Sequence, residues 1–156
     1  MWGQVHAGAV ANAIPQTGFA EATVRSLDAH IWESAQKVVP DLVRQLAAPY
    51  GVDVEVDMFT SVPPCVNDEA STTLIRSVAM EVLGSQAVTT TDQSLGGEDF
   101  AWILGKVPGA LARLGVRRHN VADGGDLHQG TFDIDEDAMA VGVRLLCGVA
   151  LATYPA

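Results

Sequence analysis

Positively charged residues are scarce in this chain. It carries 9 Lys and Arg against 19 Asp and Glu in 156 residues, which gives a formal net charge of −10. Proteins that bind nucleic acid neutralise phosphates with clustered Lys and Arg, and a strongly acidic chain is poorly suited to that role. We therefore expect no nucleic-acid partner. An excess of carboxylates is compatible with a metal-dependent protein, but by itself it identifies no function.

Long apolar runs are also absent. No stretch of about 18 apolar residues occurs, so we expect no membrane partner and no membrane-spanning helix. The first residues, Met1–Gln4, have neither the basic nor the apolar segment of a secretory signal, and we expect a cytoplasmic location. Hydrophobic residues nevertheless make up 48% of the chain, which indicates a folded domain with a core.

Cysteine is scarce as well. The two cysteines, Cys65 and Cys147, do not form a CxxC pair, which leaves zinc-ribbon and thioredoxin-like sites without support. We expect reduced, mostly buried thiols that pack as small apolar side chains. Cys65 follows two prolines in a predicted loop and is expected to be the more accessible of the two.

The first third of the chain predicts strands around one helix. Loose alternation predicts strands at 1–6 and 17–26, and the strict alternation of Val with Asp or Glu at 52–57 predicts the clearest strand. Apolar residues spaced by three and four predict a helix over 29–50. Pro40 lies inside this helix and is expected to kink or divide it. Its apolar face contains Ile31, Ala35, Val38, Val39, Leu42 and Leu46.

The remainder predicts helices joined by loops and short strands. The expected helices span 68–83, 99–104 and 136–153, and the expected short strands span 88–91 and 111–116. Asn67 or Asp68 is expected to cap the first of these helices. The elements together predict an α/β fold. The last helix has an apolar face formed by Met139, Val143, Leu146 and Ala150.

Residues 96–100, GGEDF, place two acids after two glycines. Glycines let a backbone approach a ligand closely, and a carboxylate can accept a proton or orient a metal-binding His. A flexible turn followed by a helix cap explains the same residues without a ligand. On spacing alone this structural interpretation is favoured.

Asp123, Asp126 and His128 lie in one loop. Imidazole and carboxylate are normal ligands of zinc and related metals, but one short loop rarely supplies a complete metal site. A solvated loop is therefore favoured on spacing alone. No nucleophile constellation, P-loop, dinucleotide-binding fingerprint or HExxH motif occurs. Three further histidines are expected to be structural or exposed: His6, His30 and His119.

Four segments in order resemble the signatures of one family over essentially the whole chain. They are VHAGAVANAIP at 5–15, PPCVND at 63–68, GGEDFA with VPGA at 96–110 and HQGTFDIDE at 128–136. They are similar to hAGxAxNVIP, PPVVND, GGEDFAxxLxxVPGA and HSPxFDIDE. The family is the dinuclear zinc or manganese amidohydrolases, which include aminoacylases, hippurate hydrolases, auxin-conjugate hydrolases and glutamate carboxypeptidases.

The resemblance implies an architecture of two parts. Residues 1–60 would be the last three-quarters of an α+β lid domain that also dimerises. Residues 61–156 would be the C-terminal part of an α/β zinc-peptidase-like catalytic domain. The resemblance also implies that the other metal ligands, a general-base Glu and a lid His lie upstream of Met1.

The resemblance assigns roles to six positions. His128 matches a metal ligand, whereas Asn12 and Arg25 match residues that hold the substrate carboxylate, for which the planar fork of Arg is well suited. An active-site loop is matched by Gly96, Gly97 and Glu98, with Glu98 the only candidate catalytic residue in the chain. Gln129-Gly130 replaces the usual Ser-Pro after the ligand His, which loosens that loop.

The activity implied is hydrolysis of the amide bond of N-acyl amino acids or related peptides. Two divalent ions (zinc, manganese or cobalt) would activate water in the intact enzyme. One His cannot hold a catalytic metal, so we expect the chain alone to be inactive and to bind no metal tightly. The expected partner is a second copy or an upstream half. The alternatives are a non-catalytic binding or assembly module that reuses the lid surface, and a standalone metal-binding domain built on Asp123, Asp126 and His128.

Overall fold

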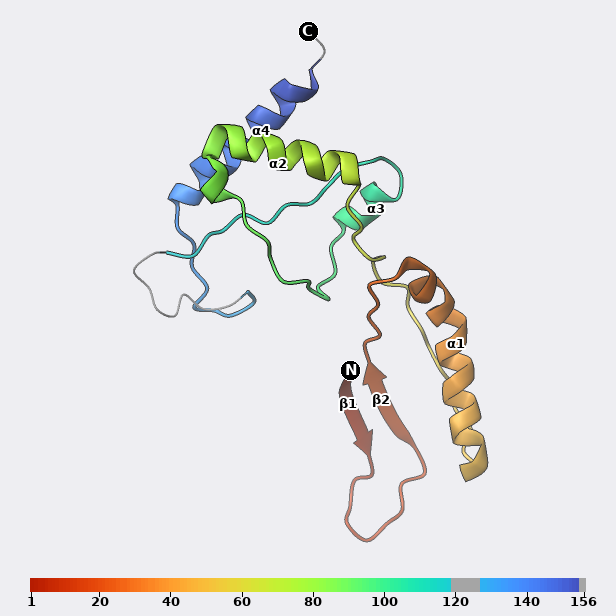
Figure 1. Ribbon diagram of the computed structural model, residues 1–156. Coiled ribbons are helices and arrows are strands. Elements are labelled where there is room, and N and C mark those ends of the chain that lie inside the picture. The colour runs from red at the N-terminus through yellow and green to blue at the C-terminus, as the bar shows by residue number, and fades with distance from the viewer. Residues whose placement is uncertain (119–126, 155–156) are drawn as a thin grey trace. The chain divides into compact units, whose positions relative to one another are not determined.

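The computed structural model describes residues 1–118 and 127–154 and divides the chain into two compact units (Figure 1). Unit 1 consists of Met1–Pro64 with Leu95–Glu98, and unit 2 consists of Cys65–Ser94 with the described part of Asp99–Ala156. Helices and strands are both present, which confirms the α/β class. The assignment of 1–60 to a lid and of 61–156 to a catalytic domain stays a prediction.

An antiparallel hairpin begins unit 1. Strand β1 (Trp2–Ala7) pairs with β2 (Gly18–Ala22) in a register that sets Val5 opposite Ala20, with an irregularity between Trp2 and Gln4. Both predicted strands are confirmed, although the second is shorter than expected. The backbones of Met1 and Thr23 exchange two further hydrogen bonds beyond the strands, at 2.8 and 2.9 Å.

Helix α1 (Ala29–Ala47) follows the hairpin and passes through Pro40 without a break. The Asp28 carboxylate caps it by accepting from the backbone N–H groups of Ile31 and His30, and these bonds, the one from Ile31 foremost, lower the pKa of Asp28. Pro40 does not divide the helix, and the other expected outcome, a kink at Pro40, stays a prediction. Pro40 is the one buried residue of α1, so packing of its ring offsets the lost hydrogen bond.

The clearest predicted strand, at 52–57, is wrong. After the short 3-10 helix η1 (Ala48–Tyr50) and a turn at Gly51 (φ 65), the chain is extended but forms no strand. Its side chains still alternate, since Val54 and Val56 are half-buried whereas Asp53, Glu55 and Asp57 are exposed. A strand needs a hydrogen-bonded neighbour, and the sheet in the described part of the chain contains only β1 and β2.

Unit 2 is built on two packed helices. Helix α2 (Glu69–Leu83) begins at the predicted cap Asp68 and ends at Gly84, and α4 (Asp137–Thr153) crosses it (Figure 1). Between them come the 3-10 helix η2 (Ser85–Ala87) and the short helix α3 (Phe100–Leu104). All three predicted helices are confirmed. The strands predicted at 88–91 and 111–116 are wrong, because neither segment has a pairing partner among the described residues.

The Asn67 side chain fixes the connection into α2. Its amide donates to Leu111 O and accepts from Leu111 N, both at 2.9 Å, and Asp68 N donates to Gly109 O. This two-way bonding ties 109–111 to the start of α2. The backbone N–H and C=O of Leu111 are thus hydrogen-bonded to a side chain and not to a neighbouring strand.

Few side chains are buried. Among the described residues the buried apolar side chains are Val78, Ala79, Ala101 and Ala138 in unit 2 and Pro40 in unit 1. The chain exposes 12855 Å², whereas two compact domains of half its size would expose roughly 9,000 Å² together. The predicted apolar face of α4 is among the exposed surfaces, with Met139 57%, Val143 60% and Leu146 71% exposed.

Neither of the two cysteine side chains is fully buried. Cys65 and Cys147 are both free, but Cys147 is exposed and Cys65 is half-buried. The prediction of mostly buried thiols, with Cys65 the more accessible, is therefore wrong, because α4 presents Cys147 on an uncovered side. Among residues 1–118 and 127–154, none of the helices has both the length and the apolar character needed to cross a membrane.

We predict that Gly148→Ala separates α2 from α4. A Cβ at Gly148 would lie 2.8 Å from Val78 Cγ1 and 3.3 Å from Val82 Cγ1, so something must move. Overpacking costs about 1–3 kcal/mol, which exceeds the gain of up to about 1 kcal/mol in helix propensity. Thermal unfolding followed by circular dichroism measures the loss.

Gly142→Ala is the matched control within the same helix. Its Cβ would meet only the flexible end of Leu114, at 3.2 Å, so this variant should be neutral or stabilising. Val78→Ala should restore part of the stability lost in Gly148→Ala. If both alanines in α4 behaved alike, the proposed tight contact at Gly148 would be wrong.

We predict a pH-dependent cap at Asp68. Its carboxylate accepts from the backbone N–H and the hydroxyl of Ser71, both at 2.8 Å, and the backbone bond is the largest cause of its lowered pKa. Because the folded pKa lies below the ordinary value of 3.8, the stabilisation is present above that pH and is lost as pH falls through the folded pKa.

Asp68→Ala should lower the unfolding temperature at pH 7. Asp68→Asn keeps an uncharged cap and should lower it less. The difference between the natural chain and Asp68→Asn should vanish once the pH is below the folded pKa. A difference that stayed constant from pH 7 to pH 2 would contradict this account.

Candidate functional site

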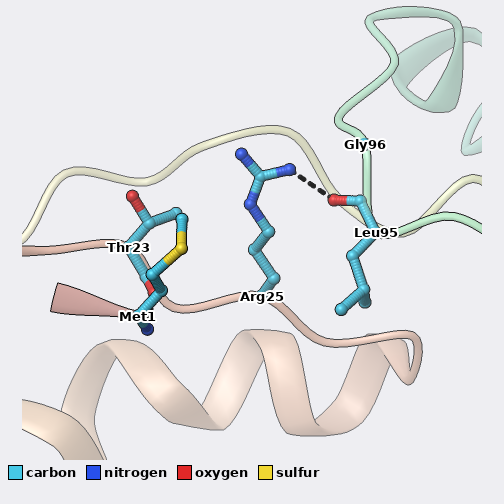
Figure 2. A pocket seen from close by; sticks show the side chains of 5 residues that line it. All are labelled: Met1, Thr23, Arg25, Leu95 and Gly96. Atoms are coloured by element: carbon cyan, nitrogen blue, oxygen red, sulfur yellow. Dashed lines mark hydrogen bonds between the residues drawn. The ribbon is translucent and has the colours of Figure 1, made fainter. Parts of the chain in front are cut away.

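A pocket in unit 1 gathers the start of the chain, the segment after β2 and the returning segment 95–98. Its lining residues are Met1, Thr23, Arg25, Leu95 and Gly96 (Figure 2). The Arg25 guanidinium donates from Nη1 to the carbonyl of Leu95 at 2.5 Å, across 70 positions of sequence. This bond joins two segments that the sequence analysis singled out separately.

Gly97 allows the returning segment 95–98 to approach Val62 closely. A Cβ at Gly97 would lie 2.8 Å from Val62 Cγ2, closer than packed carbon atoms tolerate. Three of the four predicted substrate-binding residues therefore lie together, with Arg25 and Gly96 in the pocket and Gly97 next to Gly96. Their role in binding substrate stays a prediction.

The charge of Arg25 is not matched by a carboxylate. The ion pairs in the described part of the chain join Arg44 to Asp41 and Arg118 to Asp133. A guanidinium has five N–H donors, and the bond to Leu95 uses one of them. The exposed Arg25 can therefore bind an anion, and its planar fork suits a carboxylate.

Asn12 and Glu98 lie outside this pocket. Asn12 is exposed in the turn that joins β1 to β2, and Glu98 is exposed at the end of the returning segment. Neither side chain lines the pocket with Arg25. The assignment of Asn12 to the substrate carboxylate and of Glu98 to catalysis stays a prediction.

His128 belongs to unit 2 and lies in an exposed turn. It has a φ of 72°, in the left-handed region that a non-glycine residue adopts at a cost of about 1 kcal/mol. Strained backbone of this kind is concentrated at functional sites. The assignment of His128 as a metal ligand comes from the family resemblance, and it stays a prediction.

The described residues do not make a complete metal site. No group of three His, Cys, Asp or Glu side chains among them is placed to hold an ion. A catalytic zinc usually has about three protein ligands, so no reaction step through a metal follows from these residues. Asp123, Asp126 and His119, which enter the metal-loop alternative and the histidine predictions, lie outside the described residues.

The sequence did not predict that Met1, Thr23 and Leu95 line this pocket. Leu95 contributes its backbone carbonyl to Arg25, and Met1 and Thr23 join each other through backbone atoms. Backbone groups carry no residue-specific signal, so only the glycines beside Leu95 marked this segment.

Comparison with known proteins gives one family. The family model described as Peptidase family M20/M25/M40 matches residues 6–152. The match includes all the segments on which the resemblance was based except the first residue of one of them, Val5.

Two curated relatives and one solved structure illustrate the similarity. The chain is 45% identical over 145 residues (93% of the chain) to a putative glutamate–cysteine ligase 2-3 of Rhodococcus jostii. It is 33% identical over 137 residues (88% of the chain) to the N-acetyl-L-cysteine deacetylase of Bacillus subtilis. The crystal structure of the Bacillus subtilis YXEP protein, a dinuclear metal binding peptidase from the M20 family, matches 97% of the chain with a TM-score of 0.75 at 27% identity.

The chain spans only part of each of these proteins. It covers 18% of the ligase-named protein, 31% of the deacetylase and 41% of the YXEP chain.

We predict that Gly97→Ala releases the returning segment. Its Cβ would collide with Val62, so the segment should shift and the bond from Arg25 to Leu95 should weaken. Faster amide exchange at Gly96, measured by NMR, would report the shift. Val62→Ala in the same chain should reverse it.

Gly105→Ala is the control, because its nearest neighbours would be at ordinary contact distances of 3.6 Å or more. It should leave the exchange of Gly96 unchanged. Unchanged exchange in Gly97→Ala as well would show that the close approach to Val62 does not position the segment.

Proposed function

The chain belongs to peptidase family M20/M25/M40, and we propose on this basis that it supplies the substrate-carboxylate clamp of a metal-dependent amidohydrolase. The proposed reaction is hydrolysis of the amide bond of an N-acyl amino acid or a related peptide. The residues that would complete the metal centre are not among those described. The proposed metals are zinc, manganese or cobalt, with His128 as one ligand.

The observation that carries the proposal is the environment of Arg25. Its guanidinium is exposed, has no carboxylate partner among the described residues and lies in a pocket with Gly96. The bond to the Leu95 carbonyl fixes one edge of the guanidinium and leaves the other N–H donors for a ligand. A free α-carboxylate is the group on an N-acyl amino acid that such a fork recognises.

Similarity supports this class of substrate. The name of the Bacillus subtilis relative denotes a deacetylase of N-acetyl-L-cysteine, an N-acyl amino acid. The ligase-named relative is more similar in sequence, but the chain covers only 18% of it. We therefore propose the hydrolase activity of the family rather than the ligase activity in that name.

We propose further that residues 1–60 are part of a lid and dimerisation domain and residues 61–156 part of a catalytic domain, in a cytoplasmic enzyme. The division of the structure into compact units between Pro64 and Cys65 supports this boundary. The natural state would be a homodimer or an assembly with an upstream half. The chain alone is expected to be inactive, with Asn12, Gly97 and Glu98 contributing only in the assembled site.

The alternative is a non-catalytic binding or assembly module. The observation in its favour is the large exposed apolar surface, since a monomer rarely leaves such surface uncovered. This module would form a defined oligomer without any substrate and would need neither Arg25 nor His128.

The assay that separates these functions is hydrolysis of N-acetyl and N-benzoyl amino acids with added zinc, manganese or cobalt. The chain is tested alone and together with the polypeptide encoded immediately upstream. Activity only in the mixture supports the proposal. Activity in neither, with a stable oligomer of the chain alone, supports the assembly module.

We predict that Arg25→Gln raises KM for N-acetyl amino acids in the active assembly. Loss of hydrogen bonds to a charged group, each worth about 1.5–3 kcal/mol, should raise KM about 10- to 100-fold. The corresponding N-acetyl amino acid amides lack the carboxylate, so their KM should change little. Steady-state kinetics on both substrates measures the difference.

Arg44→Gln is the matched control. Arg44 is an exposed Arg of α1 paired with Asp41 at 3.5 Å, and its loss changes the net charge by the same amount. It should leave both KM values unchanged. Equal losses on acid and amide substrates in Arg25→Gln would mean that Arg25 does not bind the carboxylate.

A further inference from the structure

The Arg25 guanidinium is held from two sides within unit 1. On the backbone side, the next residue is the half-buried Ser26, whose hydroxyl accepts from Asp28 N–H at 3.1 Å at the start of α1. On the other side, Arg25 Nη1 donates to the Leu95 carbonyl (Figure 2). The orientation of the guanidinium fork therefore depends on where the Leu95 carbonyl lies, and whatever supports that carbonyl supports the clamp.

Val62 supports the segment that carries the Leu95 carbonyl. The Val62 side chain is half-buried, and its Cγ2 atom would lie 2.8 Å from a Cβ atom at Gly97. Gly97 follows Leu95 by two residues. Closely packed groups transmit a displacement to one another, so a shift of Val62 displaces the peptide that carries the Leu95 carbonyl.

Thr60 ties Val62 to helix α1. The Thr60 hydroxyl donates to the side-chain oxygen of Gln36 at 3.0 Å, across 24 positions of sequence. Figure 1 shows the chain after α1 returning beside that helix. Only one residue separates Thr60 from Val62, and the prolines at 63 and 64 stiffen the backbone that follows. The hydrogen bond to Gln36 therefore holds Val62 at one place along α1.

Helix α1 thus supports both sides of the clamp. Asp28 caps the helix on the side of Arg25, and Gln36 supports the side of Leu95. The eight residues from Asp28 to Gln36 span about 12 Å along the helix axis. A helix keeps such a separation constant, so the two supports stay in register with each other.

We propose that Gln36 and Thr60 are positioning residues for the carboxylate clamp at Arg25. Their hydrogen bond holds Val62 in place and, through it, the Leu95 carbonyl to which Arg25 donates. The guanidinium fork is then oriented before a carboxylate arrives, and binding does not have to order it. This inference rests on the proposed function, because it assigns the two residues to the same site.

The NMR signal of the Leu95 carbonyl carbon tests the positioning on the chain alone. Its ¹³C shift changes when a hydrogen-bond donor is lost, and Arg25→Gln gives the value for the broken bond. Thr60→Val removes the donor with little change of shape, and Gln36→Ala removes the acceptor. Both should move the shift towards the Arg25→Gln value, whereas Thr60→Ser keeps the hydroxyl and should leave it in place.

Thr17→Val and Gln45→Ala are the matched controls. Thr17 is an exposed residue of the connection between β1 and β2, and Gln45 is exposed on the same helix as Gln36. The controls repeat the two substitutions at other places in unit 1. Neither should move the carbonyl shift of Leu95.

A double-mutant cycle tests the route through Val62. Val62→Ala should itself move the carbonyl shift of Leu95. Thr60→Val added to Val62→Ala should cause no further movement, because the support has already been removed. A further movement equal to that of Thr60→Val alone would show that Thr60 does not act through Val62, and the proposal would be wrong.

Kinetics of the active assembly test the consequence for the clamp. Thr60→Val should raise KM for N-acetyl amino acids about 2- to 10-fold, the effect of one ordinary hydrogen bond, with kcat unchanged. KM for the corresponding amides should not change, and Thr60→Ser should keep the natural KM. A merely structural role would lower the unfolding temperature without separating acid from amide substrates.

Three results would overturn the proposal. They are a carbonyl shift of Leu95 that neither Thr60→Val nor Gln36→Ala moves, controls that move it equally, and a rise in KM that acid and amide substrates share. The proposed function fails separately, when Arg25→Gln affects acid and amide alike or no assembly is active. The carbonyl shift in the chain alone then still decides whether Gln36 and Thr60 position Leu95.

Discussion

Backbone hydrogen bonding decides which extended segments of this chain become strands, and most other features follow from it. The hairpin forms because β1 and β2 lie close in sequence and satisfy each other. The 52–59 segment has the better strand pattern but no hydrogen-bonded neighbour among the described residues, so it stays a single extended segment. The apolar stripe of α1 remains exposed for the same reason, since a helix is covered by a sheet and not by one strand.

The helices could be predicted from the sequence, whereas the pairing neighbours of extended segments could not. Capping by Asp28 and Asp68 and termination at Gly84 are local events, and the sequence located α1, α2 and α4 to within a few residues. The helix is not divided at Pro40, which was one of the two outcomes expected there, and the burial of the Pro40 ring is a tertiary effect that local sequence does not reveal. The strands at 52–57 and 111–116 were wrong because alternation reports the two sides of a segment and says nothing about what lies beside it.

The candidate site was predictable in its residues and not in its geometry. Resemblance identified Arg25, Gly96 and Gly97, but the hydrogen bond that unites them is made to a backbone carbonyl, which has no signature in sequence. Asn12 and His128 lie in exposed turns and Glu98 in an exposed irregular segment, and the surroundings of such segments have no local signature in the sequence. The residue types were therefore predictable, whereas the hydrogen bond from Arg25 to Leu95 that brings them together came only from the structure.

The bond from Arg25 to Leu95 also sets an order of events during synthesis. The guanidinium emerges from the ribosome 70 residues before the carbonyl that fixes it, which at ordinary elongation rates is a delay of roughly 4–14 s. Helix α2 emerges within that interval. Unit 1 thus cannot be completed until α2 has been made, and the Arg25 guanidinium spends that interval without its hydrogen bond to Leu95.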